Sequence, residues 1–238
     1  PAQIADTFTS IGLMLDKPLT GGVLDLEHRF DRSDWLSIIG CARDFAAYQN
    51  LPLILPKSYT QKGKPATPET LVKIKVECPE LVRRFNTRVF KNITVKQSPE
   101  WLKSRLEAYG MPSINNIVDI TNYVMIEYGQ TLHAQDLAKF DPKDKSIVIR
   151  NASKNEKITT LDGTQVALDE SMFVLANGGE AVVIGGIVGG LKTAVTESTV
   201  NIVLDSGNYN QTNIRQTSRK LKIQNESSSR NDKFLHPH

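Results

Sequence analysis

The amino-acid sequence predicts an α+β protein whose helices and strands are largely segregated along the chain. Apolar residues recur at helical spacing near the N-terminus. After Lys145 the pattern changes to short apolar runs separated by tight-turn residues, which is typical of antiparallel strands. No segment repeats elsewhere in the chain. These observations predict a small N-terminal helix–strand unit followed by a larger, mixed and largely antiparallel α+β domain.

Residues 1–50 form the predicted small unit. A helix is expected over 2–15 and a short strand over 23–26, after two glycines. Ser33 and Asp34 are good helix-opening residues, so a second amphipathic helix is expected from there to about residue 46. Residues 51–70 are assigned to a linker, because 51–68 hold four prolines and three lysines.

Residues 71–238 form the predicted larger domain. Its strands are expected at 71–77, 83–95 and 202–205, and its helices at 98–109, 115–128 and 213–221. Ser98 is the expected cap of the first of these helices, with Pro99 at the first helical position, and Gly129 is expected to end the second. Hairpin turns are expected at Asp162-Gly163 and Asn177-Gly178.

Composition excludes several protein classes. The chain has 238 residues, a net charge of +3 and 39% hydrophobic residues, which is typical of a folded rather than a disordered protein. Two distant cysteines, Cys41 and Cys78, exclude a disulfide scaffold. The longest apolar run, near 181–188, is far shorter than the roughly 20 residues of a membrane span. Residues 1–16 do not resemble a signal peptide, so a cytoplasmic location is expected.

The glycine-rich segment 185–193 invites comparison with a phosphate-binding loop. Leu191 separates Gly190 from Lys192, however, and a P-loop requires glycine directly before lysine. Threonine- and valine-rich sequence follows where a P-loop would open a helix. The glycines instead predict a backbone wall without side chains, beside which a flat ligand can lie.

His133 is the histidine that draws attention, because it is expected on a loop leaving a helix, three residues before Asp136. Its side chain titrates near neutral pH, although a lone loop histidine is often merely structural or solvated. No histidine has metal-ligand spacing to a cysteine, so no metal is expected. No serine or cysteine has the context of a covalent nucleophile, so any hydrolysis would use water as the attacking group.

A basic segment lies near the C-terminus. Residues 212–233 hold six bases and two acids, an excess that can attract a phosphate backbone or can simply form a solvated helix face.

Short motifs in a fixed order carry a family resemblance. They are SPEWLK at 98–103, INNIVD at 114–119, TNYVM at 121–125, GQTLHA at 129–134, LDG at 161–163, GIVGG at 186–190 and IRQTSRKL at 214–221. In this order and spacing they resemble the editing (B3/B4) domain of the beta subunit of bacterial phenylalanyl-tRNA synthetase. The segment DRSDWLS at 31–37 resembles the part of that subunit that precedes the domain.

The resemblance implies hydrolysis of tyrosine wrongly attached to phenylalanine tRNA. It places Thr121, Asn122 and His133 near the ester and its water. It makes Gly185 and Gly186 the flat wall for the aromatic ring, and Asp205 the acceptor of the tyrosine hydroxyl. It implies no cofactor, no metal, no ATP-dependent aminoacylation, and no binding of DNA or membranes.

The resemblance also implies macromolecular partners. These are the acceptor end of the tRNA and a synthetase alpha subunit. The bases expected to meet the tRNA backbone are Arg215, Arg219, Lys220 and Lys222.

Some residues depart from the family pattern. Asp205 stands where the family has glutamate, Gln135 where it has an aromatic residue and Thr131 where it has proline. The tail 229–237 is a degenerate version of the family's ending. Two alternatives to an editing esterase therefore stay open: a non-catalytic scaffold that docks tRNA or a synthetase subunit, and a protein that binds a free aromatic amino acid.

Overall fold

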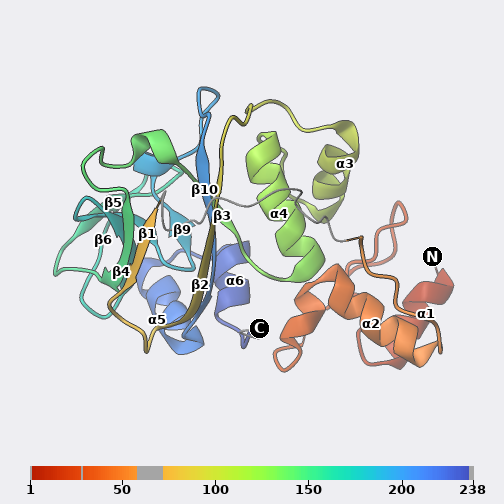
Figure 1. The fold of residues 1–238 in the computed structure, drawn as a ribbon. Helices are drawn as coiled ribbons and strands as arrows, with labels where there is room; N and C mark the ends of the chain where they lie inside the picture. Colours follow the sequence, from red (N-terminus) through yellow and green to blue (C-terminus); the bar gives the residue numbers. More distant parts are fainter. Residues whose placement is uncertain (1, 28, 58–71, 236–238) are drawn as a thin grey trace.

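The computed structural model describes residues 2–27, 29–57 and 72–235, and its α+β architecture confirms the predicted fold class (Figure 1). The helices are α1 (Ala2–Ser10), α2 (Ile38–Tyr48), α3 (Glu100–Tyr109), α4 (Asn116–Tyr128), α5 (Gln211–Leu221) and α6 (Glu226–Asn231), with 3₁₀ turns η1 (Ser33–Leu36), η3 (Leu137–Lys139) and η4 (Leu191–Thr193). The strands are β1 (Lys73–Val76), β2 (Val82–Phe90), β3 (His133–Asp136), β4 (Ser146–Asn151), β5 (Lys157–Thr159), β6 (Gln165–Ala167), β7 (Phe173–Asn177), β8 (Glu180–Ile184), β9 (Val188–Gly189) and β10 (Ile202–Tyr209).

The strands form three sheets. The order is β1-β4-β7-β8-β9 in the largest sheet, β2-β10-β3 in the second and β5-β6 in a short hairpin. Apart from the parallel pair β1–β4, the strand pairs in the described part of the chain are antiparallel. The turns at Asp162-Gly163 and Asn177-Gly178 join β5 to β6 and β7 to β8, which confirms both predicted hairpins.

The main hydrophobic core joins the five-stranded sheet, β10 and α5. Phe173 on β7, Val203 on β10 and Ile214 on α5 are among its buried members. Strands β7 and β8 contribute almost continuous apolar sequence, because both faces of these central strands are covered. Alternate residues of β10, including Val203, face this core, so Asp205 points to the same interior side.

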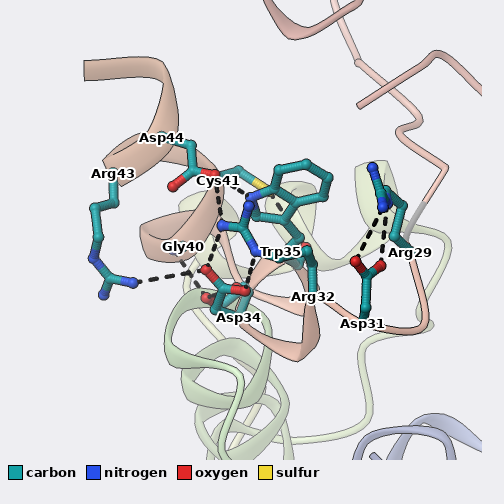
Figure 2. A network of polar contacts seen from close by, with 10 residues as sticks. Arg29, Asp31, Arg32, Asp34, Trp35, Gly40, Cys41, Arg43 and Asp44 are labelled. Carbon is teal, nitrogen blue, oxygen red and sulfur yellow. Dashed lines mark hydrogen bonds and ion pairs between the residues drawn. The ribbon is translucent and has the colours of Figure 1, made fainter. Parts of the chain in front are cut away.

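The N-terminal unit has its own small core around Phe8, Leu13 and Trp35. A polar network beside it centres on Arg32, whose guanidinium bonds Asp34 at 2.8 and 3.0 Å and Asp44 at 2.5 Å (Figure 2). The same guanidinium lies 4.1 Å from the centre of the Trp35 ring. The motif at 31–37 is thus a folding element that fixes the turn leading into α2. The domain boundaries at 50 and 70 stay a prediction, and residues 58–70 of the expected linker lie outside the described residues.

Three local predictions in the N-terminal unit need correction. Helix α1 ends at Ser10 rather than near residue 15. Residues 23–26 form only isolated bridges, Thr20 to Val23 and Leu15 to Leu26, because the tight turn at Gly21-Gly22 leaves no length for a ladder. The residues after Ser33 form the 3₁₀ turn η1, and the cap of the following helix is Ser37, whose Oγ accepts from the Gly40 N–H at 2.9 Å.

The helix pair α3 and α4 follows its sequence signals more closely. Asn115 caps α4 and Gly129, in the left-handed conformation, ends it as predicted. The cap of α3 is Pro99 rather than Ser98. Ser98 instead donates to Asp119, a fully buried carboxylate on α4 that also accepts from Ser113 and from the Ile114 N–H. Helix α4 packs against both α3 and α2, so it connects the N-terminal unit to the larger domain (Figure 1).

The short helix α6 is absent from the sequence predictions, and it joins three parts of the fold. Its Arg230 is 2% exposed. The guanidinium donates to the Leu36 carbonyl at 3.2 Å and to the Tyr109 hydroxyl at 3.0 Å, and it pairs with Glu226. The C-terminal segment therefore holds the N-terminal unit and α3 against the rest of the domain.

We expect Arg230→Ala to lower the free energy of unfolding by about 2–4 kcal/mol, because it removes a buried side chain that bonds three elements and opens a cavity in its place. Arg219→Ala, on the exposed side of α5, is the matched control and should change it by less than about 0.5 kcal/mol. Urea unfolding followed by circular dichroism measures both. Equal effects of the two substitutions would show that Arg230 does not hold the parts together.

Candidate active site

Two titratable side chains predicted for the site lie directly opposite each other. His133 opens β3, and its register partner on β10 is Asp205. Residues so paired in an antiparallel ladder share one face, here the face toward the core. His133 was expected on a loop leaving a helix, and this is wrong: after the helix end at Gly129, three residues suffice to reach the sheet.

Burial gives these two side chains unusual protonation behaviour. Asp205 is 4% exposed, and burial raises the pKa of its carboxyl to about 7. His133 as a residue is partly exposed, but its Nε2 is covered and has no hydrogen-bond partner within the described residues. Burial lowers the pKa of this imidazole to about 4. Near neutral pH the site therefore holds an uncharged histidine beside an acid that is partly protonated.

Gln135 fixes the orientation of Asp205. Its Nε2 donates to Asp205 Oδ2 at 3.0 Å, and its Oε1 accepts from the Thr193 hydroxyl at 3.1 Å. All three residues are buried. Sequence reasoning noted Gln135 only as a departure from the family pattern. Its position two residues after His133, on the same strand face, is the signal that could have assigned it to the site.

The glycines beside the site make close contacts with the chain's own side chains. A Cβ on Gly185 would lie 1.9 Å from the Phe173 ring, and one on Gly186 would lie 2.8 Å from the Tyr209 ring. A Cβ on Gly189 would lie 2.3 Å from Cε1 of His133. The expected close approach is therefore present, but the rings are those of the protein. A wall for a ligand's ring at Gly185 and Gly186 stays a prediction.

Helix α6 ties the glycine segment to the approach of β3. Asn231, 2% exposed, donates from Nδ2 to the Gly186 carbonyl at 2.9 Å and to Thr131 Oγ1 at 3.1 Å. Ser227 donates to the same carbonyl at 3.1 Å, and Asn225 donates to the Ile187 carbonyl at 3.0 Å. These residues, which the sequence analysis did not assign to the site, set the distance between its two sides.

Thr121 and Asn122 lie on α4 rather than on the paired strands. Thr121 is buried and donates to the Val118 carbonyl at 2.7 Å, a bond within its own helix. Asn122 is half-buried. Within the described residues no hydrogen bond joins either side chain to His133 or Asp205, so their roles at the ester stay predictions.

The predicted tRNA-binding bases lie on or directly after α5, and two of them already have acidic partners. Lys220 pairs with Asp169 at 2.5 Å, and Arg215 lies 3.7 Å from Asp232. Arg219 and Lys222 have no ion pair among the residues that the structure describes. The net charge that this helix offers to a polyanion is smaller than the sequence indicates.

Other classes of site find no support in the described ranges. No group of three or more His, Cys, Asp or Glu side chains there is arranged to hold a metal ion. Burial raises the pKa of both cysteine thiols, Cys41 and Cys78, to about 11, so neither is an activated nucleophile. None of the described helices combines the length and apolar character needed to cross a bilayer.

The fold and the sequence define the class of protein. Residues 81–238 match the family model described as the B3/4 domain, and the chain belongs to this family.

Its relatives are beta subunits of phenylalanine–tRNA ligase, which confirms the resemblance found in the sequence. The chain is 42% identical to the protein of Clostridium tetani over 221 residues, 92% of this chain and 27% of that protein. It is 42% identical to that of Fusobacterium nucleatum over 213 residues, 90% of this chain and 26% of the relative. The chain thus spans little more than a quarter of the length of these relatives.

One solved structure is also similar, an N-terminal fragment of the phenylalanyl-tRNA synthetase beta-subunit from Pyrococcus horikoshii. Sequence identity is 16% and the TM-score is 0.45, over 95% of this chain and 68% of that chain. A likeness at this level carries no inference.

The shifted pKa values of His133 and Asp205 should affect how the free energy of unfolding depends on pH. The pKa of Asp205 is raised from 3.8 to about 7, so this group stabilises the folded state at low pH and loses that contribution as pH rises to about 7. The pKa of His133 is lowered from 6.5 to about 4, so its contribution is lost as pH falls below 6.5. Between these limits the two contributions oppose each other.

The wild type should lose stability through Asp205 as pH rises from about 4.5 to 6.0, and Asp205→Asn should not. We therefore expect the free energy of unfolding of Asp205→Asn minus that of the wild type to increase over this range, by up to about 1.4 kcal/mol per pH unit. Urea unfolding at several pH values measures this slope. Asp169→Asn, at the surface, is the control. Parallel pH profiles for wild type and Asp205→Asn would contradict the raised pKa.

Gly186 and Gly163 provide a matched test of the close contacts, since both have positive φ, +68° and +85°. A Cβ on Gly163 meets nothing within 4 Å, whereas one on Gly186 would lie 2.6 Å from Ile214 Cδ1. We expect Gly163→Ala to cost about 1 kcal/mol from backbone strain, and Gly186→Ala to cost about 1–3 kcal/mol more from overpacking. Thermal and urea unfolding measure the difference, and equal costs would exclude a packing role for Gly186.

Proposed function

We propose that this chain is the editing region of a phenylalanine–tRNA ligase beta subunit, and that it hydrolyses tyrosine wrongly attached to phenylalanine tRNA. The observation that carries the proposal is the register pair His133–Asp205 on the interior face of β3 and β10. An acid and a neutral imidazole are the two groups that this reaction requires: one to recognise the tyrosine hydroxyl and one to direct the attacking water.

Asp205 supplies the discrimination between tyrosine and phenylalanine. In its ionised form, which a pKa of about 7 leaves partly populated near neutral pH, its carboxyl group accepts the phenolic O–H in a charge-assisted hydrogen bond. Phenylalanine has no such donor, so its binding would leave a desolvated carboxylate without a partner. Gln135 holds Oδ2 of this carboxylate at 3.0 Å and leaves Oδ1 for the substrate.

His133 supplies a base that is neutral at physiological pH. Its low pKa keeps the imidazole neutral, so Nε2 can accept a hydrogen bond when the proton is on Nδ1. Nε2 has no competing partner among the described residues. A neutral imidazole so placed can orient a water and take its proton as the water attacks the ester carbonyl. Nε2 is covered, so the proposal includes displacement of the groups that cover it when the ester enters.

The partners in this proposal are the acceptor end of the tRNA and the synthetase alpha subunit, in the cytoplasm. ATP-dependent aminoacylation belongs to other parts of the ligase. Water is the co-reactant of the ester hydrolysis, and the proposal assigns no step to a metal or cofactor. Thr121 and Asn122 approach the ester from α4 in this arrangement.

A specific observation favours a second candidate, a scaffold without activity. The rings of Phe173 and Tyr209 occupy the space beside Gly185 and Gly186, where the substrate ring would have its wall. A domain that has lost editing would keep such packing and would still dock tRNA or a synthetase subunit. The third candidate, binding of a free aromatic amino acid, has no observation of its own in its favour.

Deacylation separates these candidates. We expect the chain to release tyrosine, and much less phenylalanine, from the tRNA of phenylalanine. We expect His133→Ala to slow tyrosine release about 100-fold or more, because a general base is lost. We expect Asp205→Asn to slow tyrosine release by about 10-fold to 100-fold, because a hydrogen bond to a charged group is lost.

The matched controls are Glu197→Gln and Lys154→Ala, which alter surface charge at exposed residues elsewhere. Ester loss at the uncatalysed rate, together with retained tRNA binding, would overturn the esterase proposal in favour of the scaffold. Binding of free tyrosine without tRNA binding would favour the third candidate.

A further inference from the structure

A cavity of about 780 Å³ lies between the N-terminal unit and the outer face of the sheet β2-β10-β3. Its lining includes Arg43 on α2, Arg84 and Asn86 on β2, Tyr128 at the end of α4, Ser206 on β10 and Phe234. Asp205 and Ser206 are neighbours on β10, and their side chains point to opposite faces of the sheet. The cavity therefore backs directly onto the proposed active site.

The charge of this cavity is positive. Arg43 and Arg84 line it, and Arg88 continues the exposed face of β2 two residues beyond Asn86. The acid among the described lining residues is Asp34, whose carboxylate is already bonded by Arg32 (Figure 2). Figure 2 shows the Arg43 guanidinium at the far side of this carboxylate, 3.9 Å from it, and more than half of the Arg43 side chain is exposed.

Two exposed aromatic rings accompany these charges. Tyr128 is 52% and Phe234 57% exposed. The Phe234 backbone is anchored, because its carbonyl accepts from the Ser33 hydroxyl at 2.6 Å, and the Arg83 guanidinium lies 5.5 Å from its ring centre. Exposed rings beside guanidinium groups are the combination on which nucleic-acid bases stack while their phosphates are neutralised.

Polar side chains complete the lining. Asn86 and Ser206 are register partners on β2 and β10, and both face the cavity. Amide and hydroxyl groups can donate to and accept from the edge of a base that is not paired. A cavity of this volume is within the range of small-molecule sites.

We propose that this cavity binds a nucleotide, with the base against Tyr128 or Phe234 and the phosphate between Arg43 and Arg84. The nucleotide would be a unit of single-stranded RNA, so this inference rests on the proposed function insofar as that RNA is the tRNA strand. It adds an RNA contact on the outer face of β2 to the contact expected on α5.

The test measures binding alone, with the 238-residue chain and a fluorescent single-stranded RNA of twelve nucleotides. We expect Tyr128→Ala to weaken binding about fivefold or more through lost stacking, and Tyr128→Phe to bind like wild type. We expect the double variant Arg43→Ala/Arg84→Ala to weaken binding and to reduce the slope of log K against log salt by about 1.4. The charge-matched control is Lys154→Ala/Lys157→Ala, at two exposed residues, which should leave both quantities unchanged. The α5 double variant Arg219→Ala/Lys222→Ala tests the alternative RNA contact.

Further arms identify the source of the ligand. Displacement of the RNA by adenosine monophosphate at stoichiometric excess would assign the cavity to a free nucleotide, and displacement by RNA alone would assign it to a strand. Loss of binding in the α5 double variant, with normal binding in the Arg43/Arg84 variant, would overturn the inference. RNA binding through the cavity without deacylation would support the cavity inference and contradict the proposed function. Deacylation together with normal RNA binding by the cavity variants would support the proposed function and contradict the cavity inference.

Discussion

The buried guanidinium of Arg230 is the interaction on which the arrangement of the domain depends. It bonds a carbonyl of η1, a hydroxyl of α3 and a carboxylate of its own helix. The Nη1 and Nη2 atoms of this deeply buried guanidinium bond all three elements and hold them at fixed separations, whereas its Nε has no hydrogen-bond partner among the described residues. The next residue, Asn231, uses its amide in the same way to hold Gly186 and Thr131. Helix α6 thus links the packing of the whole chain to the geometry of the candidate site.

The sheet β2-β10-β3 separates two different environments. Its interior face carries His133, Gln135 and Asp205 in surroundings of low polarity, where both titratable groups favour their neutral forms. Its outer face carries arginine side chains beside an open cavity, to which α4 and the C-terminal tail contribute the aromatic rings. Strand alternation alone produces this division, because consecutive residues of β10 serve opposite faces. A strand of eight residues can therefore position an ester-cleaving site and a nucleic-acid contact back to back.

Sequence reasoning was most successful where the signal is local. The end of α4 at Gly129, both hairpin turns and the strands β1, β2 and β10 follow from residues that act within one turn or one ladder. Strand β3, by contrast, was expected to be a loop. Sequence reasoning failed for residues 23–26, where the tight turn at Gly21-Gly22 leaves no length for a ladder, and for Ser33, which opens the 3₁₀ turn η1 beside the buried Trp35. It also missed α6, because six polar residues have no periodic apolar pattern, and their stability comes from buried contacts 100 or more residues away.

The departures from the family pattern explain why the site could be predicted only in part. Taken one at a time, Thr131, Gln135 and the changed tail read as signs of decay. In the structure two of these changes meet, since Thr131 bonds Asn231 of the tail, and Gln135 bonds the shorter acid Asp205. A carboxylate one methylene shorter than glutamate remains fixed when an amide from the neighbouring strand supports it. Such pairs are visible only in the structure, because single positions of a sequence do not show which side chains are in contact.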